Sequence, residues 1–375
     1  MKILIFSNLP SPYFVEYLNE LGKYADVIAV FERKKASDRD KSWEIVNAKN
    51  FKYFFLKGLK IGNEASLSFG AKKYIKLYKD RIIIFGNPTT PTGILGIRFC
   101  KKHKISYCVQ SEGGFARVGN DFKTKLKKYL FSNCSLYLTG MKPSTDYFYS
   151  YGAPIEKIKQ YPFSSLSEKD LIKKPVSIEE KEKLKKELGI NCSKMILYVG
   201  SMIYRKGVDL LLNSLKELNG DVCLYCIGGE STKELSKIIK ENNIKNAFFI
   251  AHSNLNVLKK YYRAADLFVL PTRYDTWGLV VNEAMAYGLP VVTTKNCVAG
   301  LQLIEDGKNG YLVESESVDG LTNAIQKCLD MSNALEMPVN NIEKIKNYTY
   351  ENMGLTIFNH LKTIDSEDLN QYEKQ

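Results

Sequence analysis

Short apolar segments alternate with longer amphipathic segments along the chain, and this alternation limits the choice of fold more than any other feature. Helical segments such as 11–23 and 91–104 lie between most of the apolar runs in the first 165 residues. Alternating strands and helices predict a parallel sheet covered by helices on both faces. The expected strands of this first series are 2–7, 26–31, 52–57, 81–86, 105–110 and 136–140.

A second series of the same kind follows a stretch at 160–175, which contains two Pro and three Ser and predicts a domain boundary. A helix at 177–189 opens the series, because Ser177 and Glu180 have the spacing of a capping box and Gly189 suits a helix end. We therefore predict an α/β chain of two tandem, doubly wound, parallel-sheet domains, with a ligand in the crevice at the carboxyl ends of the strands. The expected strands here are 195–200, 222–229, 247–251, 266–272, 290–294 and 310–314.

Hydropathy and cysteine spacing exclude several classes of protein. No apolar run approaches the roughly 18 residues of a membrane helix. The first run, Ile3 to Phe6, is too short for a signal peptide and is typical of a buried strand. Cys223 and Cys226 lie three positions apart on a predicted strand, so they face opposite sides and cannot share a metal. We expect all eight cysteines to be packing thiols in a reducing cytosol.

The charge of the chain is concentrated in its first half. Residues 1–165 hold 28 Lys and Arg against 13 Asp and Glu, a net charge of +15, whereas the remaining residues carry −2. Such asymmetry suggests that the first half faces an anionic partner. The candidates are nucleic acid, an anionic membrane surface and a phosphorylated acceptor.

Several familiar chemistries have no motif in this chain. No GxGxxG follows the first strand, which disfavours a dinucleotide cofactor, and there is no P-loop and no HExxH. The acidic pair of "DRD" at 38–40 lies in a charged loop with no strand before it, so it gives little support to a metal site. The three histidines, His103, His252 and His360, are too far apart to suggest a cluster.

The first positive signal is "YVGSMIYRKGVDLLL" at 198–212, in which a strand leads through Arg205 and Lys206 into a helix. Basic side chains and free backbone N–H groups at the carboxyl edge of a strand can bind an anion. An ordinary strand-to-helix loop with solvated basic residues is the alternative.

The second signal is "YDTWGLVVNEAMAYGLPVV" at 274–292, which places Asp275 before a helix and Glu283 one turn inside it. The start of that helix offers N–H groups to phosphate, and a carboxylate at Glu283 can hold the vicinal hydroxyls of a ribose. The alternative for Glu283 is a solvated helix residue. Large apolar neighbours, Trp277 and Leu279, favour an enclosed site instead.

These stretches resemble the retaining GT-B glycosyltransferases of family 4, the group 1 type, over nearly the whole length of the chain. "DTWGLVVNEAMAYGLPVV" is similar to that family's two acids separated by seven residues, and "VGSMIYRKG" and "GLQLIEDGKNGYLV" are similar to two further motifs. The resemblance implies a GT-B architecture of two Rossmann-like domains, 1–165 and 166–347, with the donor site in the interdomain cleft. It also implies that 348–375 forms a helix crossing back to the first domain.

The resemblance assigns a role to each matching residue. Lys206 would bind the donor diphosphate, Glu283 the ribose hydroxyls and Asp275 the hydroxyls of the donor sugar. Gly278 and Leu279 would offer backbone N–H groups. The implied reaction is a retaining hexosyl or other glycosyl transfer (EC 2.4) from a nucleotide sugar, with UDP-sugars first, that needs no cofactor and no metal. We also assign Ser201, Arg205, Trp277 and Gly228 to donor binding.

Three departures from the family pattern matter. Ser201 stands where the family has Arg, and Arg205 is the candidate substitute. Asp275 is one methylene shorter than the usual Glu, which leaves the identity of the donor sugar open. In "SEGGF" at 111–115, Glu112 is either a catalytic carboxylate on the acceptor side or a residue that caps a loop.

The basic first half fits a glycan or polyprenyl-linked acceptor held at a membrane. The stretches 72–81 and 122–131 interleave Lys with aromatic and aliphatic residues, a pattern found on anionic membrane surfaces, although a basic solvent face is the alternative. We therefore expect a cytoplasmic, peripheral protein of the inner membrane face, in bacterial surface-polysaccharide or capsule biosynthesis. An inactive GT-B binding or regulatory subunit, a GT-B epimerase and a nucleic-acid-binding protein remain alternatives; no motif for reading nucleic acid is present.

Overall fold

The computed structural model describes residues 1–34, 46–62, 65–112, 114–116, 119–140, 142–251, 254–330 and 336–364. The acidic stretch at 38–40, His252 and the last eleven residues of the predicted C-terminal segment lie outside these ranges. Contacts divide the chain into two compact units, Met1–Ser164 with Tyr348–Gln375, and Ser165–Asn347.

Unit 1 is built on a parallel seven-stranded sheet in the order β3-β2-β1-β6-β7-β8-β9. Its central strands are almost wholly apolar and buried, as expected of a sheet that is covered on both faces. The strands are β1 (Lys2–Ser7), β2 (Asp26–Phe31), β3 (Phe51–Phe55), β6 (Ile82–Phe85), β7 (Cys108–Ser111), β8 (Tyr137–Thr139) and β9 (Ile158–Gln160).

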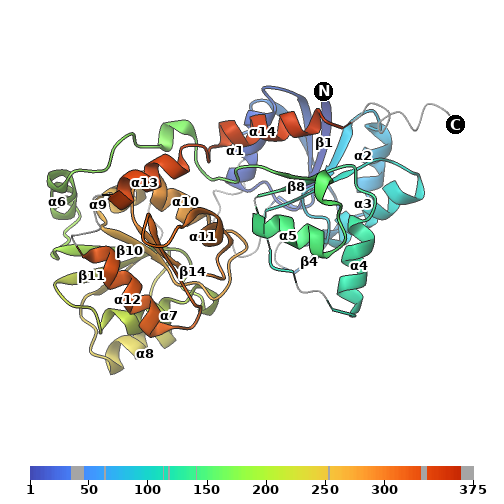
Figure 1. Ribbon diagram of the computed structural model, residues 1–375. Coiled ribbons are helices and arrows are strands. Elements are labelled where there is room, and N and C mark those ends of the chain that lie inside the picture. The colour runs from blue at the N-terminus through green and yellow to red at the C-terminus, as the bar shows by residue number, and fades with distance from the viewer. Residues whose placement is uncertain are drawn as a thin grey trace. The chain divides into compact units, whose positions relative to one another are not determined.

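Helices cover both faces of this sheet. α2 (Ala71–Leu77), α3 (Pro91–Lys102), α4 (Phe122–Phe131) and α5 (Lys142–Ser150) pack on one face, because their apolar residues join one core with those of β1, β6 and β7. α1 (Pro12–Leu21) lies beside α14 (Tyr350–Leu361), as Figure 1 shows. The two helices approach closely at Gly354, where a Cβ would lie 2.9 Å from the backbone nitrogen of Leu21. A small antiparallel hairpin, β4 (Leu59–Ile61) and β5 (Ala65–Leu67), stands apart from the main sheet.

Unit 2 has a parallel six-stranded sheet in the order β12-β11-β10-β13-β14-β15. The strands are β10 (Lys194–Val199), β11 (Val222–Ile227), β12 (Ala247–Ile250), β13 (Leu267–Leu270), β14 (Val291–Thr294) and β15 (Gly310–Val313). α7 packs beside α8 and α12, α9 beside α6, and α10 beside α13. These helices are α6 (Ile178–Glu187), α7 (Val208–Leu215), α8 (Lys233–Glu241), α9 (Leu255–Ala264), α10 (Leu279–Ala286), α11 (Val298–Leu303), α12 (Val318–Leu329) and α13 (Glu336–Ile345).

The predicted α/β chain with two doubly wound parallel sheets is therefore confirmed. The helix start at Ser177 is also confirmed, since its hydroxyl accepts a hydrogen bond from the Glu180 backbone N–H at 3.2 Å. The Glu180 carboxylate accepts from the Arg263 guanidinium on α9 instead of completing the capping box. Gly189 follows α6 with φ of 69°, a left-handed conformation that favours glycine.

The prediction that every cysteine is a free thiol is wrong for two of them. Cys192 and Cys223 form a disulfide, with their Cα atoms 6.0 Å apart. Cys192 precedes β10 and Cys223 lies on β11, so the pairing of these neighbouring strands brings together residues 31 positions apart in sequence. The other six cysteines are buried and free: Cys100, Cys108, Cys134, Cys226, Cys297 and Cys328.

Candidate functional site

The sheet of unit 2 reverses its strand order at β10, with β11 on one side and β13 on the other. In open α/β sheets, ligands bind in the crevice at the carboxyl ends of the strands, at such a reversal. Two loops follow the strands at this edge, residues 200–207 after β10 and 271–278 after β13. They contain most of the residues that the sequence assigns to donor binding.

Gly207 determines how the first loop approaches the second. It has φ of 73°, and a Cβ at this position would lie 2.0 Å from the carbonyl oxygen of Pro271. Only glycine allows such a close approach of two backbones. The single turn of 3₁₀ helix before it, Tyr204–Lys206, therefore carries Arg205 and Lys206 to the loop after β13.

Lys206 and Asp275 form an ion pair at this edge. The Lys206 ammonium group donates to the Asp275 carboxylate, and Arg205 Nη1 lies 3.6 Å from the other carboxylate oxygen. Asp275 is only 7% exposed. Its backbone N–H donates to the Asn296 carbonyl at 3.0 Å, which fixes the carboxylate against the end of β14. Either cation can pair with an anionic ligand in place of the Asp275 carboxylate.

Arg273 stiffens the same pair of loops from outside. Its guanidinium makes a two-pronged salt bridge to Asp209 at 2.8 and 2.7 Å and also pairs with Glu316. The same group lies 3.7 Å from the centre of the Tyr204 ring and donates to the Tyr204 carbonyl at 2.6 Å. These contacts tie the turn that carries Lys206 to the loop that carries Asp275.

The start of α10 is shaped by Gly278, which has φ of 97°. A Cβ there would lie 2.7 Å from the Cys297 sulfur, so glycine is needed for space as well as for conformation. The indole N–H of Trp277 donates to the Asn282 side chain at 2.9 Å inside the domain. Trp277 therefore serves to hold the helix start, and Leu279, the first residue of α10, has a backbone N–H with no partner within the helix.

Glu283 lies in the middle of α10 and accepts two hydrogen bonds. Tyr262 Oη donates to it at 2.9 Å, and Ser165 Oγ donates at 3.1 Å. Burial raises the pKa of Glu283 above its ordinary value, although both hydrogen bonds act in the opposite direction. Because Glu283 and Asp275 have different sets of partners, each carboxylate can bind a separate part of a ligand.

Two further predicted donor residues lie at strand ends in unit 2. Ser201 follows β10, is exposed, and has its carbonyl hydrogen-bonded by the Tyr198 hydroxyl at 2.9 Å. Gly228 follows β11 with φ of 125°, and a Cβ there would lie 2.6 Å from the carbonyl oxygen of Gly200. Both therefore belong to the edge at which Lys206 and Asp275 meet.

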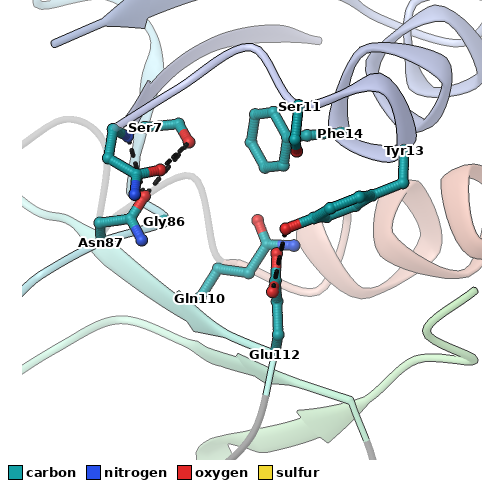
Figure 2. A pocket seen from close by; sticks show the side chains of 9 residues that line it. Ser7, Ser11, Tyr13, Phe14, Gly86, Asn87, Gln110 and Glu112 are labelled. Carbon is teal, nitrogen blue, oxygen red and sulfur yellow. Dashed lines mark hydrogen bonds between the residues drawn. The ribbon is translucent and has the colours of Figure 1, made fainter. Parts of the chain in front are cut away.

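Glu112 lies in unit 1, directly after β7, and lines a cavity at the carboxyl ends of β1, β6 and β7 (Figure 2). The Tyr13 hydroxyl, on α1, donates to its carboxylate at 3.3 Å. The Glu112 carboxylate therefore borders this cavity, and its role as a catalytic carboxylate stays a prediction.

Sequence reasoning missed the residues that support these groups. Tyr262 and Ser165 orient Glu283, and they lie 21 and 118 positions from it in sequence, beyond the reach of a local motif. Tyr13 and Asn87 line the cavity of unit 1 and were missed for the same reason. The described residues contain no group of three His, Cys, Asp or Glu side chains that could hold a metal ion.

Residues 180–347 match the family model "Glycosyl transferases group 1". The matched range lies within unit 2 and includes every donor residue named above.

Two relatives and one solved structure illustrate the similarity. An uncharacterized glycosyltransferase of Methanocaldococcus jannaschii is 30% identical over 195 residues, covering 50% of each chain. An uncharacterized protein in the cps region of Klebsiella pneumoniae is 27% identical and covers 58% of this chain and 60% of its own length. The chain thus spans about half to three fifths of these relatives. The Anabaena protein Alr3699/HepE, solved in complex with UDP, has a TM-score of 0.76 at 17% identity over 97% of this chain and 100% of that one. This likeness confirms the predicted GT-B fold.

Proposed function

We propose that this chain of GT-B fold is a glycosyltransferase that moves a sugar from a nucleotide sugar to a glycan or polyprenyl-linked oligosaccharide acceptor. The observation that carries the proposal is the ion pair of Lys206 and Asp275 at the sheet edge where the strand order reverses. The match of residues 180–347 to group 1 glycosyl transferases supports the same reading.

Lys206 is the residue that we assign to the donor diphosphate. When a diphosphate binds, its oxygens compete with Asp275 for the ammonium group. Charge grows on the diphosphate as the bond to the sugar breaks, and a positioned cation stabilises that charge in the transition state. Arg205, 3.6 Å from Asp275, supplies a second positive charge in place of the Arg that Ser201 replaces.

Asp275 and Glu283 are assigned to hydroxyl groups on either side of the diphosphate. A carboxylate accepts hydrogen bonds from sugar hydroxyls, and hydrogen bonds to charged groups contribute about 1.5–3 kcal/mol each. We assign Asp275 to the donor sugar and Glu283 to the ribose. Tyr262 and Ser165 hold the Glu283 carboxylate in one orientation. Less side-chain entropy is therefore lost when a ligand binds to this carboxylate.

The reaction that we propose retains the anomeric configuration and needs no divalent metal, because Lys206, Arg205 and backbone N–H groups supply the positive charge at the diphosphate. UDP-sugars are the first donors to test, since the similar Anabaena protein was solved with UDP. The relative in the cps region of Klebsiella pneumoniae supports a role in bacterial surface-polysaccharide or capsule biosynthesis.

We also propose that the protein binds the inner face of the membrane through α2 and α4. Both helices pack on the same face of the unit 1 sheet, since Ile75 and Leu130 share one core. Leu77 and Phe122 lie exposed on these helices, the latter 77% exposed, and Phe69 lies exposed just before α2. None of the helices in the described part of the chain has the length and apolar character needed to cross a membrane. Exposed basic and apolar side chains together favour attachment to an anionic surface.

An inactive GT-B binding subunit is the second candidate, and Ser201 is the observation that favours it. One experiment separates the two. Thermal unfolding of the full chain is measured with a panel of nucleotides and nucleotide sugars. A ligand present at about 100 times its dissociation constant stabilises the folded chain by about 2.7 kcal/mol. Stabilisation by a nucleotide sugar with slow release of its nucleotide supports the transferase; stabilisation without any turnover in the presence of acceptor glycans supports the inactive subunit.

A further inference from the structure

The guanidinium group of Arg273 uses all of its hydrogen-bond donors inside unit 2. Nη1 and Nη2 donate to the two carboxylate oxygens of Asp209. Nε and Nη2 donate to the Glu316 carboxylate, and Nη1 also donates to the Tyr204 carbonyl. A guanidinium has five N–H donors, and these five hydrogen bonds occupy them. The side chain is only 12% exposed, and the Tyr204 ring lies across it at 3.7 Å. Arg273 therefore has no donor left for a bound molecule.

The backbone of Arg273 makes two more connections. Its N–H donates to the Arg205 carbonyl at 2.9 Å, and its carbonyl accepts from the Asn296 side chain at 2.9 Å. Arg205 follows β10, Asn296 follows β14 and Glu316 follows β15, while Arg273 itself follows β13. One residue thus joins the segments that follow four neighbouring strands at the carboxyl edge of the sheet.

Glu316 has a backbone conformation that most residues avoid. Its φ is 67°, in the left-handed region that few residues other than glycine adopt. Burial does not explain this conformation, since 55% of the side chain is exposed. Such a conformation costs free energy and persists where surrounding contacts hold it. The two hydrogen bonds from Arg273 are contacts of this kind, so one guanidinium group fixes both the segment after β15 and the turn after β10.

Arg273 acts on Lys206 through the Tyr204 carbonyl. Tyr204 and Lys206 are the first and last residues of a single turn of 3₁₀ helix. The Tyr204 carbonyl accepts from the Gly207 N–H at 3.1 Å, which closes the turn, and from Arg273 Nη1 at 2.6 Å. Hydrogen bonds within a 3₁₀ helix have poorer geometry than those of an α-helix, so a single turn is stabilised by a donor from outside it. The position of the Lys206 side chain therefore depends on the Arg273 guanidinium group.

We infer that Arg273 is a positioning residue of the donor site, which holds the turn Tyr204–Lys206 so that the Lys206 ammonium group stays paired with Asp275. That this position serves a donor diphosphate rests on the proposed function, whereas the positioning itself rests on the contacts of Arg273 alone. The planar fork of the guanidinium is required as well as its charge, because its donors point toward three separate acceptor groups. A lysine has three donors on one nitrogen atom and cannot reach all three groups.

The test is a double-mutant cycle on the full chain, with UDP affinity measured by calorimetric titration. Arg273→Gln is expected to weaken UDP binding at least about fivefold, which is the effect of losing roughly one hydrogen bond. In the Lys206→Ala background the same exchange should change the affinity less than about twofold, because the group that Arg273 positions is already absent. Arg273→Lys should behave as Arg273→Gln does. Arg81→Gln removes a largely buried arginine that pairs with Asp26 in unit 1, and this matched control should not change UDP affinity.

A second measurement needs no ligand. The NMR signal of the Lys206 ε-methylene in isotope-labelled protein, assigned by its absence in Lys206→Ala, reports on the surroundings of the ammonium group. Arg273→Gln should shift this signal, and Arg81→Gln should leave it in place. Glu316→Gly removes one partner of Arg273 without strain, since glycine readily adopts the left-handed conformation. It should shift the same signal without lowering Tm.

Three results would overturn the inference. The effects of Arg273→Gln and Lys206→Ala on UDP affinity could be additive, Arg273→Lys could bind UDP as the wild type does, or the Lys206 signal could stay unchanged in both Arg273→Gln and Glu316→Gly. Failure of the proposed function has a different signature. A wild type that neither binds UDP nor releases a nucleotide from any nucleotide sugar contradicts that function, and the Lys206 signal then decides by itself whether Arg273 positions the turn.

Discussion

The ammonium group of Lys206 is paired with the carboxylate of Asp275, although the two residues lie on loops 69 positions apart in sequence. Gly207 makes the contact possible, since any side chain at that position would strike the Pro271 carbonyl. The pair joins the ends of β10 and β13, where the sheet reverses its strand order. The close approach of the two backbone loops thus positions Lys206 and Asp275, the cation and the acid that we assign to the donor.

Lys206→Ala is expected to lower kcat/KM more than Arg205→Ala. Lys206 alone occupies the partly buried position against Asp275, whereas Arg205 is more exposed and also hydrogen-bonds the Tyr274 carbonyl. Removing a positioned group that stabilises transition-state charge costs about 10²–10³ in rate. Steady-state assays of both variants with the same donor provide the comparison. A larger loss for Arg205→Ala would identify it as the main diphosphate ligand.

Glu283→Ala is expected to weaken nucleotide binding by about tenfold or more while the fold remains intact, because one or two hydrogen bonds to a charged group are lost. Tyr262→Phe should weaken it less, since it removes the hydroxyl that orients Glu283 and keeps the ring stacked on Tyr287 at 5.3 Å. Calorimetric titration with UDP, combined with circular dichroism, distinguishes lost binding from lost structure. Unchanged affinity in Glu283→Ala would remove Glu283 from the site.

Glu32 should make the stability of unit 1 depend on pH. Its carboxylate is buried and accepts hydrogen bonds from the Ser66 N–H at 3.0 Å and from Thr90 Oγ1, so it ties the β4–β5 hairpin to the start of α3. Burial raises its pKa from 4.5 to about 7. The unfolded chain therefore loses the proton first as pH rises, and unfolding becomes easier between about pH 4.5 and 7. Over this range the contribution of Glu32 to the free energy of unfolding falls by about 3 kcal/mol.

Glu32→Gln tests this dependence, because the amide oxygen can still accept from Ser66 and the amide NH₂ can donate to Thr90. The difference in unfolding free energy between wild type and variant, measured by urea denaturation from pH 4.5 to 8, should shift in favour of the variant as pH rises. A difference that stays constant with pH would mean that the carboxyl keeps an ordinary pKa.

Membrane attachment should depend on the lysines of α2 and α4. Each Lys near an anionic surface contributes about 1 kcal/mol before screening, and the Debye length is about 8 Å at physiological salt. Six lysines of these helices are candidates, and one of them, Lys127, has its ammonium group 4.9 Å from the centres of the Tyr147 and Tyr151 rings and should contribute least. The other five are Lys72, Lys73, Lys76, Lys125 and Lys128.

The experiment compares two triple variants by co-sedimentation with anionic vesicles. Replacing Lys73, Lys125 and Lys128 with Gln should release the protein at low salt. Replacing the exposed Lys233, Lys237 and Lys240 of α8 with Gln makes the same change of charge in unit 2 and should not release it. Equal behaviour of the two variants, or no binding by the wild type at low salt, would point to a soluble acceptor.

Alternation of strands and helices was enough to predict both sheets, since the central strands are continuous apolar runs with helical segments between them. Three of the three-residue strands, β4, β5 and β9, were not predicted. β4 and β5 have three residues each, and Leu59 and Ile61 are exposed, so the hairpin leaves no pattern of burial in the sequence. β9 is equally short and ends in an exposed Gln160.

Most of the residues that we assign to the donor could be picked out from the sequence because they lie in two local motifs, each at the end of one strand. Glu283 was recognised in this way, but its partners Tyr262 and Ser165 come from other segments. The cavity of unit 1 was not predicted as a whole, since Ser7, Asn87 and Glu112 lie at or just after the ends of three different strands and only the fold brings them together. The Cys192–Cys223 disulfide was missed because it joins the segment before β10 to the neighbouring strand β11, and only the pairing of the strands brings the two residues together.

The most direct measurement is the rate at which the full chain releases UDP from a panel of UDP-sugars in the presence of EDTA, with and without an acceptor glycan. We predict release that an acceptor accelerates, and a loss of about 10²–10³ in Asp275→Asn, which keeps the shape of the side chain but not its charge. The proposal that the protein is a glycosyltransferase that uses the Lys206–Asp275 pair would be contradicted by either of two results. One is that no nucleotide is released from any nucleotide sugar, and the other is that the Asp275→Asn variant is as active as the wild type.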